Sequence, residues 1–204
     1  MSPARTFGEA FVTLFVIMDP PGTLPVFLAL TASMTTRQRT RAATQGVLVA
    51  LVVIVVFALF GRRILDYLHV SLPALQCAGG LLLLLVALQL LTGQEADLTR
   101  AEGVNIALVP LGTPLLAGPG AIVATMVLVS GVNTPAGYTA VAVAILAVHL
   151  CLWLVLVFAT VIHKVLRDSG VTLVSRISGL LLSAIAVQLI ADAVHAFVTG
   201  SPSP

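Results

Sequence analysis

The length of its apolar stretches constrains this chain more than any other feature. A membrane-spanning helix needs ~20 mostly apolar residues. Six stretches meet that need: Phe7–Ala32, Ala42–Gly61, Leu72–Leu91, Val104–Val132, Ala136–Ile162 and Leu173–Val198. The segments that join them are short and polar, which leaves no room for a soluble domain. The sequence therefore predicts one all-α transmembrane domain over residues 1–204, with six transmembrane helices.

Composition agrees with this prediction. Hydrophobic residues make up 59% of the chain and charged residues 9%, whereas soluble domains carry about 25% charged residues. The basic residues are dispersed between apolar stretches and form no continuous stripe, so we expect no nucleic-acid binding. Cys77 and Cys151 lie in apolar stretches and share no short spacing, so neither a disulfide nor a metal site is expected, and no motif indicates a cofactor.

The chain contains an internal repeat. Setting Gly80 over Gly179 aligns "GLLLLLVALQLL" with "GLLLSAIAVQLI" and matches Gln89 with Gln188. Nearly the same offset aligns "DPPGTLPVFLAL" with "AGPGAIVATMVL", prolines and glycines included. The halves, residues 1–98 and 99–204, then hold three spans each. Because three is odd, the second half enters the membrane in the opposite sense, as in the inverted repeats of secondary transporters.

Prolines and glycines interrupt the first and fourth spans near their middles. Both breaks are expected close to the bilayer midplane, where broken helices present half-helix N-termini and free backbone groups to a central cavity. Such a break suits an anionic group, for example a substrate carboxylate. The predicted substrate-binding residues at the breaks are Asp19, Pro20, Pro21, Gly22, Pro25, Ala117, Gly118, Pro119 and Gly120.

Four stretches resemble a known family. "DPPGTLPVFLALT", "LPALQCAGGLLLLLVALQLL", "VPLGTPLLAGPGAI" and "SRISGLLLSAIAVQLIADAV" are similar to the conserved stretches of the MarC family, which includes the SnatA proteins. The resemblance covers almost the whole chain. It implies a six-span inner-membrane protein of a bacterium or archaeon, related to proteins linked to uptake of glycine, alanine and other small neutral amino acids. It also implies that either Asn or Asp is accepted at Asp19.

Asp19 is the one acidic residue well inside a predicted span. A charge at the bilayer centre costs at least ~2.5–3.5 kcal/mol, so it should face a cavity or a partner. Asp19 can bind a substrate amine, a cation or a proton, or it can cap the half-helix that follows. The second break, "GPG", is interpreted either as a substrate-lining loop or as a kink.

Three further polar residues inside the spans are candidates for function. Gln89 and Gln188 are interpreted either as hydrogen bonders between helices or as substrate contacts. His149 is a candidate for proton coupling, with a packing hydrogen bond as the alternative. Together with Asp19, it completes the coupling candidates.

The leading hypothesis is a secondary transporter of small neutral amino acids, coupled to a proton or sodium gradient. A passive channel or a metabolite exporter of the lysine-exporter type is the alternative. An intramembrane enzyme that uses Asp19 and Asp192 is disfavoured, because the repeat does not pair the two acids. The expected partners are the amino acid, the ion and membrane lipid, and a homo-oligomer is left open.

The distribution of basic residues predicts the orientation. One set of connections holds Arg37, Arg39, Arg41, Arg100, Lys164, Arg167 and Arg176, whereas the other side holds Arg5, Arg62 and Arg63. Because Lys and Arg gather on the cytoplasmic side, both termini are expected outside the cytoplasm.

Overall fold

The computed structural model describes residues 2–92 and 116–199, and this part of the chain is all-helical, with no strand. Its helices are α1 (Pro3–Met18), α2 (Thr23–Leu30), α3 (Thr36–Leu68), α4 (Leu72–Thr92), α5 (Pro119–Ser130), α6 (Pro135–Val157) and α7 (Ala159–Thr199). Four helices are long and apolar enough to cross a membrane: α3, α4, α6 and the Thr172–Thr199 part of α7.

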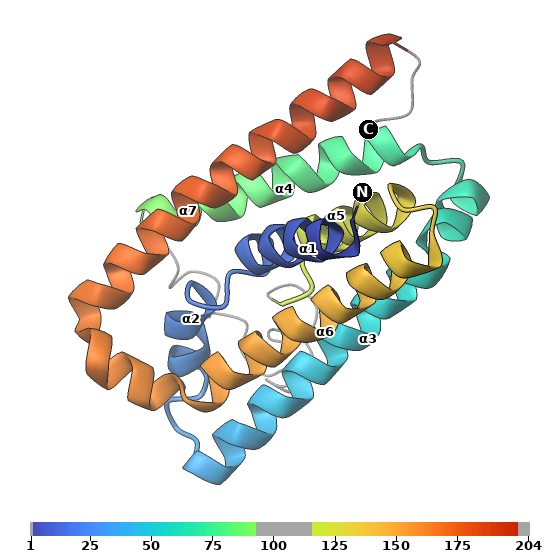
Figure 1. The fold of residues 1–204 in the computed structure, drawn as a ribbon. Helices are drawn as coiled ribbons and strands as arrows, with labels where there is room; N and C mark the ends of the chain where they lie inside the picture. The colour runs from blue at the N-terminus through green and yellow to red at the C-terminus, as the bar shows by residue number, and fades with distance from the viewer. Residues whose placement is uncertain (1, 93–115, 200–204) are drawn as a thin grey trace.

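The helices are arranged in three layers. Figure 1 shows α1 and α5 between the pair α4 and α7 on one side and the pair α3 and α6 on the other. Small and branched side chains fill the centre, and Ala10, Leu14, Ile54, Val148 and Leu152 are fully buried or nearly so. The middle layer therefore carries the first break and the start of α5 into the interior of the bundle.

The outer helices expose large apolar side chains. Examples are Leu59 on α3, Leu85 on α4, Leu150 on α6 and Leu180 on α7. Water would penalise such surfaces, whereas lipid does not. These side chains form the outer surface that the predicted membrane location requires.

The second and third predicted spans correspond to α3 and α4. α4 agrees with the predicted Leu72–Leu91 to one residue at its end. α3 extends beyond Ala42–Gly61 at both ends, because its polar flanks are also helical. It begins at a capping box, in which the Thr35 hydroxyl accepts the Gln38 N–H and the Gln38 side chain accepts the Thr35 N–H. It ends at His69, whose φ is 55°.

The connection between the fifth and sixth predicted spans is helical rather than a loop. Helix α6, which corresponds to the fifth predicted span, ends at Val157, several residues before the predicted Ile162. Helix α7 begins directly afterwards, at Ala159. α7 is 41 residues long, about twice the length that a bilayer requires, and Figure 1 shows that it bends before its apolar part. The polar segment "HKVLRDSGV" contains no proline, and most of its residues tolerate a helix.

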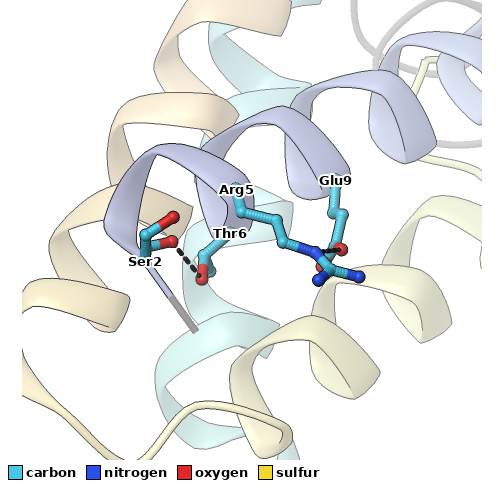
Figure 2. A network of polar contacts seen from close by, with 4 residues as sticks. All are labelled: Ser2, Arg5, Thr6 and Glu9. Carbon is cyan, nitrogen blue, oxygen red and sulfur yellow. Dashed lines mark hydrogen bonds and ion pairs between the residues drawn. The ribbon is translucent and has the colours of Figure 1, made fainter.

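The first span is two helices, as the prolines and glycine predicted. α1 ends at Met18 and α2 begins at Thr23. At the start of α1, Figure 2 shows the Arg5 Nε donating to Glu9 at 2.8 Å and the Thr6 hydroxyl donating to the Ser2 carbonyl. The Arg5 and Glu9 side chains are 70% and 46% exposed, so this end of α1 is its polar end.

The glycines of the repeat lie where α4 and α7 cross. A Cβ at Gly80 would lie 2.9 Å from the Ala186 carbonyl oxygen, and a Cβ at Gly179 would lie 3.0 Å from the Ala87 carbonyl oxygen. Ala87 and Ala186 have the same offset as Gly80 and Gly179. The two contacts are therefore reciprocal: each half supplies the glycine to one and the alanine to the other.

Helix starts repeat at the same offset. Thr35 caps α3, and Thr134 caps α6 by accepting the Gly137 N–H at 3.1 Å. A threonine therefore precedes the helix of the second predicted span in each half.

Candidate functional site

The first break begins at Asp19, directly after the end of α1. Its backbone is left-handed, with φ 42° and ψ 66°, a region that asparagine and aspartate enter more readily than other residues with a side chain. The Asp19 N–H donates to the Phe15 carbonyl at 3.0 Å and closes α1. The Asp19 carbonyl accepts the Thr23 N–H at 3.0 Å and opens α2.

The Asp19 side chain folds back over the break. Its Oδ1 accepts the Gly22 N–H at 3.1 Å. Oδ2 is buried and makes no hydrogen bond of good geometry within residues 2–92 and 116–199. The Ser178 side chain on α7 nevertheless lies close enough to interact with the carboxylate. A Cβ at Gly22 would overlap Oδ2, so only glycine fits beneath this carboxylate.

The prolines supply carbonyls to the start of α2. The Pro20 carbonyl accepts the Thr23 hydroxyl at 2.9 Å, and the Pro21 carbonyl accepts the Leu24 N–H at 3.2 Å. Pro20 is buried and Pro21 is half-buried. Pro25 lies in α2, and the placement of its side chain falls outside the description. The first break therefore uses its own groups to cap α2.

The described residues of the second break include no polar side chain that corresponds to Asp19. Ala117 is buried, and Gly118 is the N-cap of α5 with φ −61° and ψ 163° and no side-chain cap. Its carbonyl accepts the Ala121 N–H at 3.0 Å. Pro119 occupies the first turn, and Gly120 is buried, with Leu83 2.9 Å from an added Cβ. The earlier part of the predicted fourth span, residues 104–115, lies outside the described residues.

The two breaks are alike in chain path and different in chemistry. The first holds a buried carboxylate whose Oδ2 has no hydrogen-bond partner among the described residues, and the second has Ala117 at the corresponding position. The second opens a helix whose N-cap, Gly118, supplies no side-chain hydrogen bond to the positive end of that helix. One break can attract a cationic group and the other an anionic group.

Each break is packed against a helix of the other half. Ser178 of α7 faces Asp19, as described above. A Cβ at Gly79 of α4 would lie 2.6 Å from the Val123 side chain and 3.5 Å from the Pro119 carbonyl oxygen. Gly79 and Ser178 have the repeat offset, so equivalent positions face the two breaks. Ser178 could have been found from the sequence only through this equivalence with Gly79.

The two predicted glutamines lie in different surroundings. Gln89 is half-buried on α4. Gln188 is on the exposed side of α7, where its Nε2 donates to Asp192 Oδ1 at 2.7 Å. The structure thus brings Gln188 together with Asp192 of its own helix rather than with a break.

His149 lies inside the bundle. It is 3% exposed, and its Nδ1 lies 2.8 Å from the Ile145 carbonyl oxygen. Its Nε2 is buried and unpaired within the described part of the chain, and the backbone of Ala50 on α3 faces the ring. Ala50 and His149 also have the repeat offset.

Arg39 forms a clamp that no sequence pattern predicted. Its guanidinium donates to the Thr31 carbonyl at 3.0 Å, to the Thr31 hydroxyl at 3.1 Å and to the Thr160 hydroxyl at 2.7 Å. Arg39 thereby joins the end of α2 to the starts of α3 and α7. From its charge, Arg39 was assigned to a polar connection, and its hydrogen-bond partners could not be predicted.

Comparison with known proteins identifies the relatives of the chain. The model of the MarC family integral membrane proteins matches residues 4–198. A UPF0056 membrane protein of Methanocaldococcus jannaschii is 40% identical over 93% of this chain and 96% of its own length. One of Aquifex aeolicus is 35% identical over 91% of each chain.

The UPF0056 inner membrane protein YhgN of Escherichia coli is 30% identical over 94% of this chain and 98% of its own length. No solved structure matches the chain. The buried breaks, the apolar outer surface and a family match over nearly the full length lead to one conclusion. The chain is a multi-pass integral membrane protein and belongs to the MarC family.

Proposed function

We propose that this protein is a secondary transporter of small neutral amino acids. The observation that carries the proposal is the chemical difference between the two breaks. A zwitterion has an ammonium group, which suits the buried Asp19 Oδ2, unpaired within the described residues, and a carboxylate, which suits the start of α5, where Gly118 supplies no side-chain cap. The Asp19 carboxylate and the start of α5 belong to breaks in the same bundle, and α1 and α5 pack together.

We further infer that the fold is a 3+3 inverted repeat of six spans, with halves at residues 1–98 and 99–204. The reciprocal contacts between α4 and α7 support this inference, because a two-fold axis exchanges them. The contact of His149 with its own equivalent, Ala50, also supports the inference, because residues related by a two-fold axis touch each other only near that axis. Inverted repeats with broken helices at the midplane are common in secondary transporters.

The narrowness of the breaks supports a small substrate. Neither Gly22 nor Gly120 leaves room for a side chain, because the Asp19 carboxylate and the Leu83 side chain lie against them, so the space at each break is small. Glycine, alanine and serine are the amino acids of suitable size. The coupling ion is a proton or sodium, and Asp19 and His149 are the residues that respond to it, since each has a buried atom that is unpaired within the described residues.

A further part of the proposal concerns the membrane in which the protein lies. The name of YhgN places that relative in the inner membrane, and we assign this chain to the equivalent cytoplasmic membrane.

Other residues remain proposed to line the site beside those argued above. They are Pro20, Pro21, Pro25, Ala117, Pro119, Gln89 and Gln188.

Uptake into proteoliposomes tests the proposal. We expect purified protein to accumulate labelled glycine, alanine or serine against its concentration gradient when a proton or sodium gradient is imposed. Collapse of the gradient by an ionophore should abolish accumulation and leave exchange. Downhill flux that does not saturate would identify a channel instead, and no flux of any of the three would refute the proposed substrate class.

A further inference from the structure

Two buried polar side chains play no part in the breaks as described. Gln76 on α4 and Ser175 on α7 are each 2% exposed. Within residues 2–92 and 116–199, neither the Gln76 Oε1 nor the Ser175 Oγ has a hydrogen-bond partner. Leaving a buried polar atom unpaired costs stability, and native proteins keep few such groups without a reason.

The two residues are equivalent in the repeat. Gln76 and Ser175 have the same offset as Gly80 and Gly179. The same unusual feature therefore occurs once in each half, although the residue types differ. A packing accident would not be expected to recur at equivalent positions.

Both residues lie one helical turn from a position that faces a break. Ser175 precedes Ser178, which faces the Asp19 carboxylate. Gln76 precedes Gly79, which faces the Pro119 carbonyl. Residues three apart share a helix face, so each unpaired group continues the face that the break of the other half packs against.

We propose that Gln76 and Ser175 line the transport path beside the two breaks and hydrogen-bond the transported molecule. This inference rests on the proposed function for the identity of the ligand. Ser175 and Asp19 offer oxygen atoms to a cationic group, which is the substrate ammonium or an alkali cation. Gln76, one turn along α4 from Gly79, has an amide that can donate to a carboxylate.

Cysteine accessibility tests the lining role without knowledge of the substrate. Ser175→Cys and Gln76→Cys are made singly in protein that carries Cys77→Ala and Cys151→Ala. A small cationic thiol reagent that needs water should modify both. Val148→Cys, at a core position of α6 that is 0% exposed, is the matched control and should stay unmodified. Labelling of either position no faster than that of Val148→Cys would overturn the proposal.

Protection experiments then identify the ligand. Alanine at about ten times its dissociation constant should slow labelling at both positions about tenfold. Alanine that protects in sodium-free buffer assigns the Ser175 site to the ammonium, whereas sodium that protects alone assigns it to the alkali cation. Labelling that no neutral amino acid slows would refute the proposed substrate class and leave the lining role standing.

Stability of the unliganded protein gives an independent readout. Ser175→Ala and Gln76→Leu remove the unpaired atoms, so their unfolding temperatures in detergent should equal or exceed that of the wild type. Their stabilisation by alanine should be lost. Gln45→Leu, at an exposed position of α3, is the control and should keep it. Unfolding at a lower temperature, with stabilisation by alanine retained, would show that the two side chains serve packing and would overturn the proposal.

Discussion

At the scale of single residues, Asp19 combines two tasks in one side chain. Its left-handed backbone turns the chain, and its Oδ1 caps α2 through Gly22. The break itself was predictable, because proline and glycine interrupt an apolar stretch. The conformation of Asp19 was not, because a left-handed aspartate is stabilised by surroundings that sequence does not reveal.

Replacement of Asp19 separates the two tasks. Asp19→Asn should keep the break, since asparagine tolerates the left-handed region and can cap. It exchanges a charge-assisted hydrogen bond for a neutral one, so transport should stay within about tenfold of the wild type, a loss of transition-state stabilisation under ~1.4 kcal/mol. Asp19→Leu loses both tasks and should nearly abolish transport. Uptake is compared at equal amounts of membrane-inserted protein.

Asp66→Asn, at an exposed position near the end of α3, is the control and should transport like the wild type. Equal inactivity of Asp19→Asn and Asp19→Leu would mean that the negative charge is indispensable and that capping does not explain the residue.

At the scale of elements, the Arg39 clamp fixes the second half of the broken span. Its donors reach the carbonyl end of α2 at Thr31 and the first turn of α7 at Thr160. The carbonyl end of a helix favours a cation. α2 has only eight residues and is too short to be stable alone, so these contacts help to hold it in position.

Arg39→Lys should weaken the clamp, because one ammonium cannot reproduce the geometry of the guanidinium fork. A decrease of about 2 kcal/mol in the free energy of unfolding would lower the unfolding temperature by about 4–8 °C for a chain of this size. Arg37→Lys, at an exposed position of the same helix turn, should leave it unchanged. Thermal unfolding in detergent is the measurement, and equal stability of the two variants would show that the clamp contributes nothing.

The helices differ in how well sequence predicts them. α4 was predicted almost to the residue, because an apolar stretch lies between two polar ones. The bent helix α7 was not, because the polar segment around Lys164 reads as a connection although its residues also suit a helix. The offset of Gly80 and Gly179 was visible in the sequence, yet it could not reveal that these glycines lie against each other's helices.

At the scale of the whole molecule, the elements are distributed over two ends. Figure 1 shows the start of α1, the α3–α4 connection and the end of α7 at one end of the bundle, with the start of α3 and the α6–α7 junction at the other. Arg37, Arg39 and Arg41 therefore lie at the opposite end of α3 from Arg62 and Arg63. This separation agrees with the charge distribution from which the orientation was predicted.

The orientation remains a prediction that labelling can test. A single cysteine introduced as Ser201→Cys, without Cys77 and Cys151, should react with an impermeant thiol reagent in intact cells, made permeable at the outer membrane where one is present. The reason is that the more basic side should face the cytoplasm. A cysteine at Arg37, on the other side, should react only after the cells are lysed. The reverse pattern would place both termini inside.

The lone carboxylate of the first break has a consequence for the resting protein. In a carrier made of two identical inverted halves, exchanging the halves exchanges the state open to one side for the state open to the other. Those two states would then be equally populated. In the repeat, Asp19 corresponds to Ala117, so exchanging the halves changes the free energy of the carrier. Under the proposed cycle, the empty carrier has a preferred side, and substrates on the two faces of the membrane meet different apparent affinities.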